Sequence, residues 1–367
     1  MGYVAVKGGT EAIENVCSLL SWQQIKGDSS PLEVDQIRDQ LYLAVDRVMG
    51  EGSLYAPQLA ALALKQAAGD TFEAAFMLRA YRATRPRLGI SLPATTGKMR
   101  IVRRISAAFK EIPGGQLLGP TSDYSLRLLD FDLLADDAAR REAFRERLFA
   151  GRPPGEPLPA SFPKVVEILR REGLLVEKET LPPEEEPWDI TRRSLTFPAP
   201  RSAALQGMAR GETGGMLLLA YSSMRGYGNV HPTIGELRVG YIPLQVPHPA
   251  TGAPYTVGEV KVTEAEVVAR FEEGDGTPKF TLGYGLCFGQ NEVKAIAMAI
   301  LDRSTRAAEP STPAEDQEFV LSHIDGIEAM GFCNHWKLPH YVDFQSDLDR
   351  LRKAQQLDRE KKEVKEK

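Results

Sequence analysis

MRIVRRISAAF, residues 99–109, is the stretch where the hydrophobic pattern of the chain changes. Met99, Ile101, Ile105 and Phe109 are separated by even numbers of positions, so they share one face of an extended chain. This alternation predicts a strand with one buried face. Because the residues before it are spaced for helices, the predicted fold class is α+β. We expect an N-terminal helical domain followed by a mixed α/β body with an antiparallel or mixed sheet.

Apolar residues at helical spacing fill residues 31–86. Ile37, Leu41, Val45 and Val48 fall on one face of a helix, because residues three and four apart are neighbours on a helical surface. Broad apolar faces indicate that such helices pack on one another. We expect a small helical domain whose residues serve mainly as a scaffold.

A loop rich in glycine and proline, IPGGQLLGPT at residues 112–121, follows the expected strand. Glycine lets the main chain approach a ligand closely, and arginine and lysine are natural partners of phosphate. The loop is therefore a candidate phosphate site, although an irregular structural loop explains the same residues. The candidate residues are Arg103, Arg104, Lys110, Gly114 and Gly115.

The middle of the chain has the weakest pattern. Residues 125–134 are spaced as a second strand, and residues 135–200 combine charged runs with one short helical pattern at 165–173. Charged, proline-rich stretches are typical of solvated linkers. We interpret 135–200 as a variable insertion or linker whose charges face solvent.

Strand and helix patterns alternate between residues 201 and 345. Strands are expected at 216–221, 235–242, 256–262 and 280–285, and helices at 264–271, 292–306 and 314–330. The predicted division is a helical region at 1–95, a strand and glycine-loop region at 96–134, the insertion at 135–200, a mixed domain at 201–345, and a helix with a fraying tail at 346–367.

A second loop that contains glycine, RGYGNVHP at 225–232, joins two expected strands. It places Arg225 and His231 close in sequence to Glu236. Binding residues concentrate in loops that a rigid scaffold holds. These three residues are candidates for a ligand site, and a structural turn is the open alternative.

Two of the five histidines lie in GFCNHWKLPHYVDFQ, residues 331–345. Pro339 precedes the second, and proline disfavours helix at its own position and at the residue before it. We therefore expect a shaped loop, and a loop can turn His335 and His340 toward one point. Neutral imidazole suits zinc, but a zinc site usually takes about four ligands. Two loop histidines hydrogen-bonded to backbone are the open alternative.

Composition is ordinary for a soluble globular protein, with 43% hydrophobic and 26% charged residues. The formal net charge is −5, so no overall basic field recruits nucleic acid or anionic lipid. No stretch approaches the roughly 20 apolar residues of a membrane span, and no signal segment is visible. Three dispersed cysteines favour a reducing compartment over a disulfide framework. We expect a cytoplasmic protein without nucleic-acid or membrane partners.

Six short motifs together resemble one known family. They are AVKGG at 5–9, LAVDRVM at 43–49, RRISA at 103–107, IPGGQLLGPT at 112–121, RGYG at 225–228 with HP at 231–232, and KLPHYVDFQ at 337–345. They resemble the I subunit of the bacterial carbon–phosphorus lyase core complex, the PhnI family, which acts in phosphonate use. The resemblance spans nearly the whole chain apart from residues 135–200.

The resemblance implies the first step of phosphonate breakdown. An alkylphosphonate such as methylphosphonate displaces adenine from ATP and gives α-D-ribose 1-methylphosphonate 5-triphosphate. Alone, the family resembles a nucleosidase that releases the base of ATP or GTP by using water. The resemblance also implies the G, H, J, K and L subunits as partners, and ATP, together with magnesium, as substrate.

This chemistry requires particular groups near the nucleotide. Breaking an N-glycosidic bond leaves positive charge on the ribose, so a carboxylate must stabilise it and an acid must assist the base. From their clustering in the sequence we hypothesise that Glu236, His231 and Arg225 are catalytic. Arg103, Arg104, Lys110, Gly114 and Gly115 are expected to hold the nucleotide phosphates.

The resemblance gives the histidine pair a firmer role. His335 and His340 match a pair that in this family binds zinc at the contact with the J subunit, which supplies further ligands. Zinc is therefore expected as a cofactor shared with a partner. Two other functions stay open, namely a non-catalytic scaffold subunit that shares a metal site with a partner and an independent zinc hydrolase.

Overall fold

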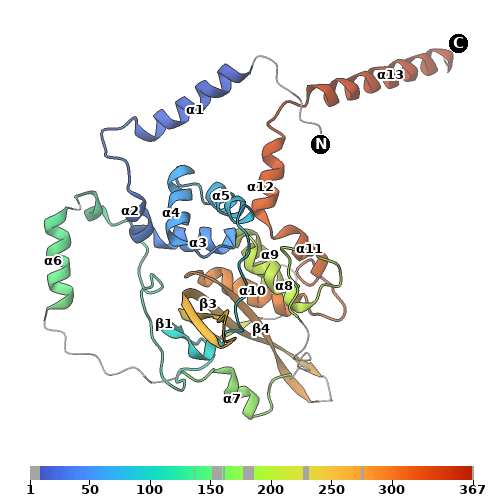
Figure 1. The fold of residues 1–367 in the computed structure, drawn as a ribbon. Helices are drawn as coiled ribbons and strands as arrows, with labels where there is room; N and C mark the ends of the chain where they lie inside the picture. The colour runs from blue at the N-terminus through green and yellow to red at the C-terminus, as the bar shows by residue number, and fades with distance from the viewer. Residues whose placement is uncertain are drawn as a thin grey trace. The chain divides into compact units, whose positions relative to one another are not determined.

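The computed structural model of the chain describes residues 9–135, 137–150, 159, 162–176, 186–225, 231–273 and 277–365, with main chain alone at 270–273. The chain divides into two compact units (Figure 1). The first unit combines Met1–Thr84 with Asp325–Lys367, and the second unit is Arg85–Ile324. Each unit is described separately below.

The described part of the first unit is helical, which confirms the predicted N-terminal helical domain. Its helices are α1 (Thr10–Ile25), α2 (Val34–Gln40), α3 (Tyr42–Gly52), α4 (Pro57–Gln66), α5 (Thr71–Ala83), α12 (Gly326–His335) and α13 (Tyr341–Lys365). The apolar faces predicted from the spacing meet in one core, formed by Ile37, Val45, Val48, Met49, Ala60, Leu64, Ala74 and Leu78. Burial of these faces stabilises helices that are individually short.

Helix α12 joins the N-terminal helices although 246 positions separate the residues that connect them. Arg79 of α5 donates from Nη1 to both carboxylate oxygens of Asp325, at 2.8 and 2.9 Å. Asp325 also caps α12, because its carboxylate accepts a hydrogen bond from the amide of Glu328. One carboxylate therefore starts the helix and attaches it to α5.

The prediction of a continuous loop at 331–345 is wrong at both ends. Helix α12 continues through His335, and α13 begins at Tyr341, so only residues 336–340 connect the two. Proline restricts its own position and the residue before it. Pro339 therefore sets the connection between the helices but does not prevent a helix from ending four residues earlier.

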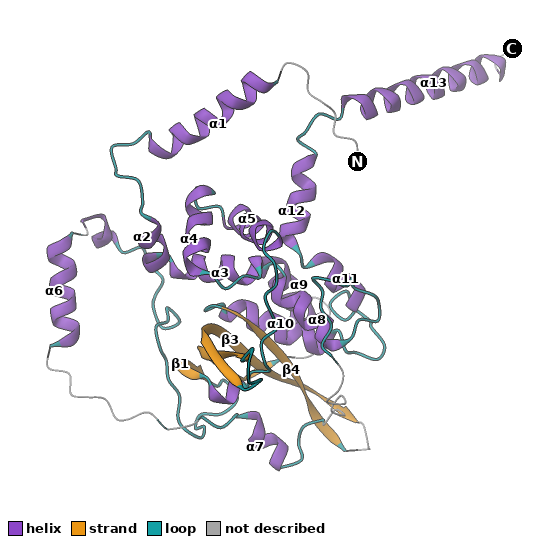
Figure 2. Ribbon diagram, viewed as in Figure 1, coloured by secondary structure: helices purple, strands orange, loops and turns teal. Residues whose placement is uncertain are grey.

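The second unit contains one four-stranded antiparallel sheet in the order β1-β2-β3-β4, drawn in orange in Figure 2. The strands are β1 (Arg100–Ile105), β2 (Thr233–Pro247), β3 (Pro254–Glu273) and β4 (Pro278–Phe288). The alternating stretch at 99–109 therefore does contain a strand. Together with the helical first unit, this sheet confirms the α+β class.

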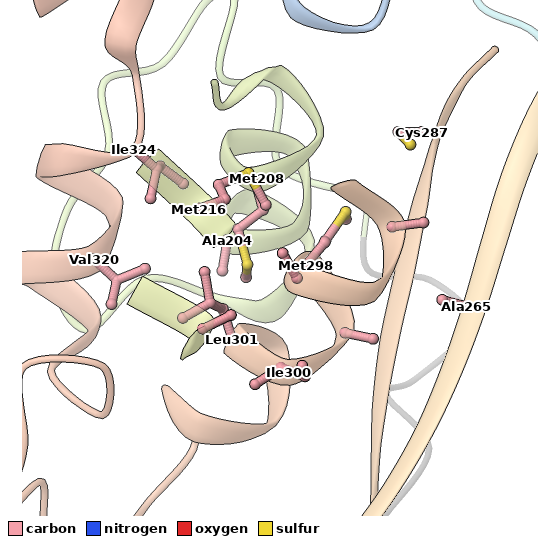
Figure 3. Packing of buried hydrophobic residues seen from close by; sticks show 14 of the residues in the cluster. Ala204, Met208, Met216, Ala265, Cys287, Met298, Ile300, Leu301, Val320 and Ile324 are labelled. Carbon is pink, nitrogen blue, oxygen red and sulfur yellow. The ribbon is translucent and has the colours of Figure 1, made fainter. Parts of the chain in front are cut away.

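Helices of the second unit cover one face of the sheet. They are α8 (Arg201–Arg210), α9 (Thr213–Arg225), α10 (Glu292–Ser304) and α11 (Gln317–His323). The main core contains Met208, Met216, Leu301, Val320 and Ile324, from these helices and the connections between them, and it extends to Ala265 of β3 (Figure 3). The helices thereby leave the opposite face of the sheet to be covered by other segments.

Helix α10 packs closely on β4 because β4 has two glycines in the contact. A Cβ atom added at Gly283 would overlap the carbonyl oxygen of Ala299, and one added at Gly285 would overlap the carbonyl oxygen of Ala295. Helix and strand therefore approach more closely than any side chain on β4 would permit. The glycine-broken strand expected at 280–285 is a packing surface.

Two predicted elements have the wrong type. Residues 216–221, expected as a strand, lie in α9, and residues 264–271, expected as a helix, lie in β3. A short apolar run does not distinguish strand from buried helix, and Glu212 starts α9 by accepting the amides of Gly214 and Gly215. In 264–271, pairing with β2 and β4 overrides the helix preference of glutamate and alanine.

The remaining differences lie between β1 and β2 and after β4. Residues 125–134 form no strand and end in a 3-10 turn, Phe131–Ala135. The predicted insertion at 135–200 contains α6 (Ala138–Phe149), without a buried residue, and α7 (Val166–Arg171). The helix expected at 314–330 is divided into α11 and α12. Within the described residues, no helix is both long and apolar enough to cross a bilayer.

Candidate functional site

The first candidate site is the histidine pair of the first unit. His335 is the last residue of α12, and His340 directly precedes α13. The centroids of their rings lie 5.1 Å apart. The short connection at 336–340 therefore does bring the two imidazoles together, as the sequence predicts.

Each imidazole is bonded to the main chain through Nδ1. The Nδ1 atom of His335 pairs with the carbonyl oxygen of Phe332, and that of His340 lies 2.6 Å from the carbonyl oxygen of Leu338. Because a carbonyl oxygen only accepts, both Nδ1 atoms donate, and in the neutral form of each ring Nε2 is then the nitrogen with the lone pair. Metal-binding histidines commonly have this arrangement. Backbone bonding and metal binding, posed above as alternatives, are therefore compatible here.

The histidine pair fits zinc in the type of its donors and supplies part of the ligand number. Zinc is usually bound by about four ligands. Among the residues that the structure describes, no group of three or more His, Cys, Asp or Glu side chains is placed to hold a metal ion. The pair can fill two positions, and the others are left to solvent or to another molecule.

Large apolar side chains surround the histidine pair at the surface. The rings of Phe332 and Trp336 lie 4.6 and 6.1 Å from that of His335, and the two residues are 53% and 63% exposed. Leu338 and Tyr341 are also more than half exposed. Contiguous exposed apolar surface marks sites of protein interaction. The histidine pair thus lies in a surface suited to a protein partner.

The second candidate site contains Arg104, which is fully buried. Its Nε donates to Glu236 at 2.5 Å, and Glu236 also pairs with Arg238 at 2.9 Å. Its two other nitrogens donate to the carbonyl oxygens of Pro113, Gly115 and Pro163, at 2.7 to 2.8 Å. The guanidinium group fixes the glycine loop and residue 163 against the sheet.

Arg103 points to the opposite face of the sheet, because successive strand residues alternate between faces. It is fully buried and pairs with Asp123 and with Glu292 at the start of α10. It also donates to the carbonyl oxygen of Leu118. The two neighbouring arginines therefore belong to two separate networks and do not converge on one ligand.

The glycine loop turns at Gly114 and Gly115, whose φ angles are 84° and 76°. Such positive values are readily adopted only by glycine. The carbonyl of Gly115 accepts from Arg104, whereas the side chain of Lys110 is exposed. Of the five predicted phosphate residues, Lys110 alone presents a cationic side chain to solvent.

The three predicted catalytic residues are placed differently. Arg225 ends α9, where its exposed side chain donates to the hydroxyl of Tyr221 at 2.9 Å. His231 is exposed before β2, whereas Glu236 is buried and paired with Arg104. The rest of the predicted loop, residues 226–230, lies outside the described residues. Among the described residues, Glu236 makes no hydrogen bond or ion pair with either of the other two.

A cluster that the sequence did not predict lies on the same sheet face as Arg104. Lys164 contacts Glu264 at 2.5 Å and Glu266 at 3.2 Å. Glu264 also accepts from the hydroxyls of Thr96, at 2.7 Å, and Tyr284, at 3.0 Å. We call these five residues the β3 acidic cluster. It joins two carboxylates on one strand with a cation and two hydroxyls.

Burial raises two pKa values in the β3 acidic cluster. The pKa of Glu266 is above its ordinary value because burial penalises the charged carboxylate, and Lys164 partly opposes that effect. The pKa of Tyr284 is raised by burial and then by the charge of Glu264. The cluster therefore combines a phenol and a carboxyl group whose charged forms are both made less favourable by burial.

Alternation in the stretch TEAEVV was the signal that could have found this cluster. Glutamates two positions apart share one face of a strand but lie on different faces of a helix. In the helix expected at 264–271, Glu264 and Glu266 would lie on different faces. No local sequence pattern links either residue to Lys164 or Tyr284. Cross-strand register supplies that link, since Glu266 is the partner of Tyr284.

Comparison with known proteins places the chain in a family. The family described as "Bacterial phosphonate metabolism protein (PhnI)" matches residues 2–358. A protein of Stutzerimonas stutzeri named "Putative C-P lyase subunit protein HtxH" is 56% identical over 97% of this chain and 96% of its own length. The match thus includes both units.

Two further relatives carry the name alpha-D-ribose 1-methylphosphonate 5-triphosphate synthase subunit PhnI. The protein from Escherichia coli strain K12 is 48% identical over 96% of this chain and 98% of its own length. That from Rhizobium meliloti strain 1021 is 46% identical over 96% of this chain and 94% of its own length. The chain belongs to the PhnI family of bacterial phosphonate metabolism proteins.

Proposed function

We propose that this chain is the subunit of a carbon–phosphorus lyase system that transfers the ribose 5-triphosphate group of ATP to methylphosphonate. Adenine leaves, and α-D-ribose 1-methylphosphonate 5-triphosphate forms. The observation that carries this proposal is the near-complete match to two relatives named as subunits of the synthase of that product. We also propose that the chain alone is a purine nucleosidase on ATP and GTP.

The proposed transfer breaks the bond between C1′ and N9 of ATP. The electron pair of that bond leaves with adenine, and a phosphonate oxygen forms a new bond to C1′. Positive charge develops on the ribose during the step, and negative charge develops on the base. The protein must therefore hold the triphosphate, place a carboxylate near the ribose and supply a proton to the base.

The phosphate residues in this proposal divide into two kinds. Lys110 is exposed and is assigned a direct contact with the triphosphate or its magnesium ion. Arg103, Arg104, Gly114 and Gly115 are assigned to hold the loop in the shape that presents it. This division follows from the burial of both guanidinium groups and from their bonds to loop carbonyls.

The predicted catalytic residues stay in the proposal as the group for the ribose and base. Arg225 and His231 are exposed at the two ends of the 226–230 segment, where they can meet a ligand. Glu236 fixes Arg104 and Arg238 and is assigned an indirect role.

For the metal, we propose that His335 and His340 hold zinc through their Nε2 atoms. The J subunit supplies the remaining ligands in this proposal, and the exposed aromatic surface around His335 supports a partner there. Bound zinc would supply a cross-link between two subunits. The G, H, K and L subunits are proposed as further partners, and the three free cysteines support a reducing cytoplasm as the location.

Incubation of the purified chain with ATP tests the proposed function. We expect free adenine, detected by chromatography. With the partner subunits and methylphosphonate present, we expect the ribose 1-phosphonate product in the phosphorus NMR spectrum. Two results together would mean that the chain is a scaffold. The chain alone would release no adenine, and the complex would form the same product with the wild-type chain and with a chain that carries Arg225→Ala and Lys110→Ala. The burial of Arg103, Arg104 and Glu236 in structural networks is the observation that favours that competing function.

A further inference from the structure

Both carboxylates of the β3 acidic cluster have a buried Oε2 without a hydrogen-bond partner among the described residues, but only that of Glu264 has an ion pair. Glu264 accepts from Thr96 and Tyr284 on Oε1 and pairs with Lys164 on Oε2. Glu266 accepts from Lys164 on Oε1, at 3.2 Å. Its other oxygen, Oε2, is buried and has no hydrogen-bond partner among the described residues.

A buried oxygen without a hydrogen bond indicates a candidate ligand position, because leaving it unbonded costs free energy. The side chain of Glu266 is 9% exposed. Leaving a buried polar atom without a partner costs about 1–3 kcal/mol, and such atoms are rare in folded proteins. A ligand with a hydrogen-bonding edge would relieve that cost at Oε2.

We propose that Glu266 donates the proton that the leaving purine takes up, with Glu264 as the fixed carboxylate beside the ribose. This assignment rests on the proposed function and names its general acid. Oε2 of Glu266 is the donor atom, because Oε1 is occupied by Lys164. The raised pKa of Glu266 supports a carboxyl group that retains a proton for donation.

In this assignment, the C1′–N9 bond breaks and its electrons pass to the purine. A ring nitrogen of the purine binds the proton from Glu266. A phosphonate oxygen, or water in the reaction of the chain alone, bonds to C1′. When water attacks, its proton returns to Glu266. When a phosphonate dianion attacks, Glu266 is reprotonated from solvent.

Neighbouring groups are less suited to this role. Both oxygens of Glu236 are engaged, one by Arg104 and Arg238 and the other by the amide of Val165. The hydroxyl of Tyr284 donates to Glu264. Among the described residues of this sheet face, Glu266 is therefore the carboxyl group whose Oε2 has neither a hydrogen bond nor an ion pair.

Two members of the cluster are partly exposed to solvent. The side chain of Lys164 is 19% exposed, and Tyr284 is partly exposed. Tyr284 and Glu266 are direct partners across β3 and β4. A purine edge could therefore approach Oε2 beside these two side chains.

The test compares two substrates in the Glu266→Gln variant. GTP needs a proton on its leaving base, whereas 7-methyl-GTP carries a cationic base that leaves without one. We expect base release from GTP to fall at least about 100-fold in the variant and that from 7-methyl-GTP to fall less than about threefold. Glu259→Gln is the matched control, because Glu259 is an exposed glutamate on the same strand.

Each outcome decides the assignment. Equal losses with both substrates would mean a structural role for Glu266, and unchanged rates with both would mean no role; either result overturns it. If Glu266→Gln does not fold, Glu266→Asp is measured in the same way, since the ratio of the two substrates is internal to each variant. A wild-type chain and complex without any base release would overturn the proposed function as well, whereas failure of this assignment alone leaves the wild type active.

Discussion

Arg103 and Arg104 are buried and bonded to groups of their own chain. Arg104 uses its three nitrogens on Glu236 and on three carbonyl oxygens, and it has no exposed surface. Planar guanidinium groups are well suited to such multiple fixed bonds. Removal of one partner from a buried pair costs about 3–5 kcal/mol because a charge is left uncompensated. Loss of activity on mutation of Arg104 would thus report loop structure as well as ligand contact.

Glu266 should make stability depend on pH. Its folded-state pKa is raised, so between the unfolded value, near 4.5, and the raised value the folded chain binds more protons than the unfolded chain. Stability then falls as pH rises through this window. We expect the free energy of unfolding of the wild type, relative to Glu266→Gln, to decline over that range. Urea unfolding of both proteins across acid to neutral pH measures it, and a difference that stays flat or rises would contradict the buried neutral carboxyl.

Among the secondary-structure elements, the contact between β4 and α10 is the most constrained. Gly283 and Gly285 lie two positions apart and so face the same helix. Their lack of side chains lets the main chain of β4 approach the main chain of α10. The same strand carries Tyr284 on its other face, so this packing also positions the β3 acidic cluster.

Substitution of Gly283 by alanine should therefore destabilise the second unit. Overpacking of this kind costs about 1–3 kcal/mol, measured as a shift in the urea midpoint. Gly258→Ala is the control, since Gly258 lies in β3 and has no atom within 4 Å of the added Cβ position. A loss of similar size in both variants would show that close packing against α10 is not the cause.

For the whole molecule, the exposed apolar surface around His335 indicates that the isolated chain is not the complete functional assembly. Phe332, Trp336 and Leu338 are each more than half exposed in the first unit. The imidazole pair beside them offers two lone pairs and too few ligands for a closed zinc site. Both features are explained if a partner covers this surface.

Zinc content of the complex with the proposed partners tests this explanation. We expect His335→Ala and His340→Ala each to remove most of the zinc, as measured by mass spectrometry. His323→Ala is the matched control, because His323 is exposed and its Nδ1 likewise lies 2.6 Å from a carbonyl oxygen, that of Phe319. Equal zinc in all three variants, or a loss with His323→Ala as well, would exclude the pair as the ligands.

Sequence alone determined the fold class, the helical nature of residues 31–86 and the candidate pairing of His335 with His340. These depend on spacing along a few turns or one short connection, which local chemistry controls. The helix expected at 264–271 failed because pairing with two distant strands outweighs local preference. The convergence of Lys164 with Glu264, Glu266 and Tyr284 was decided by sheet register and by the packing of residue 164 on the sheet. Register joins residues that are far apart in the chain. Their burial and their contacts are therefore decided only by the tertiary structure.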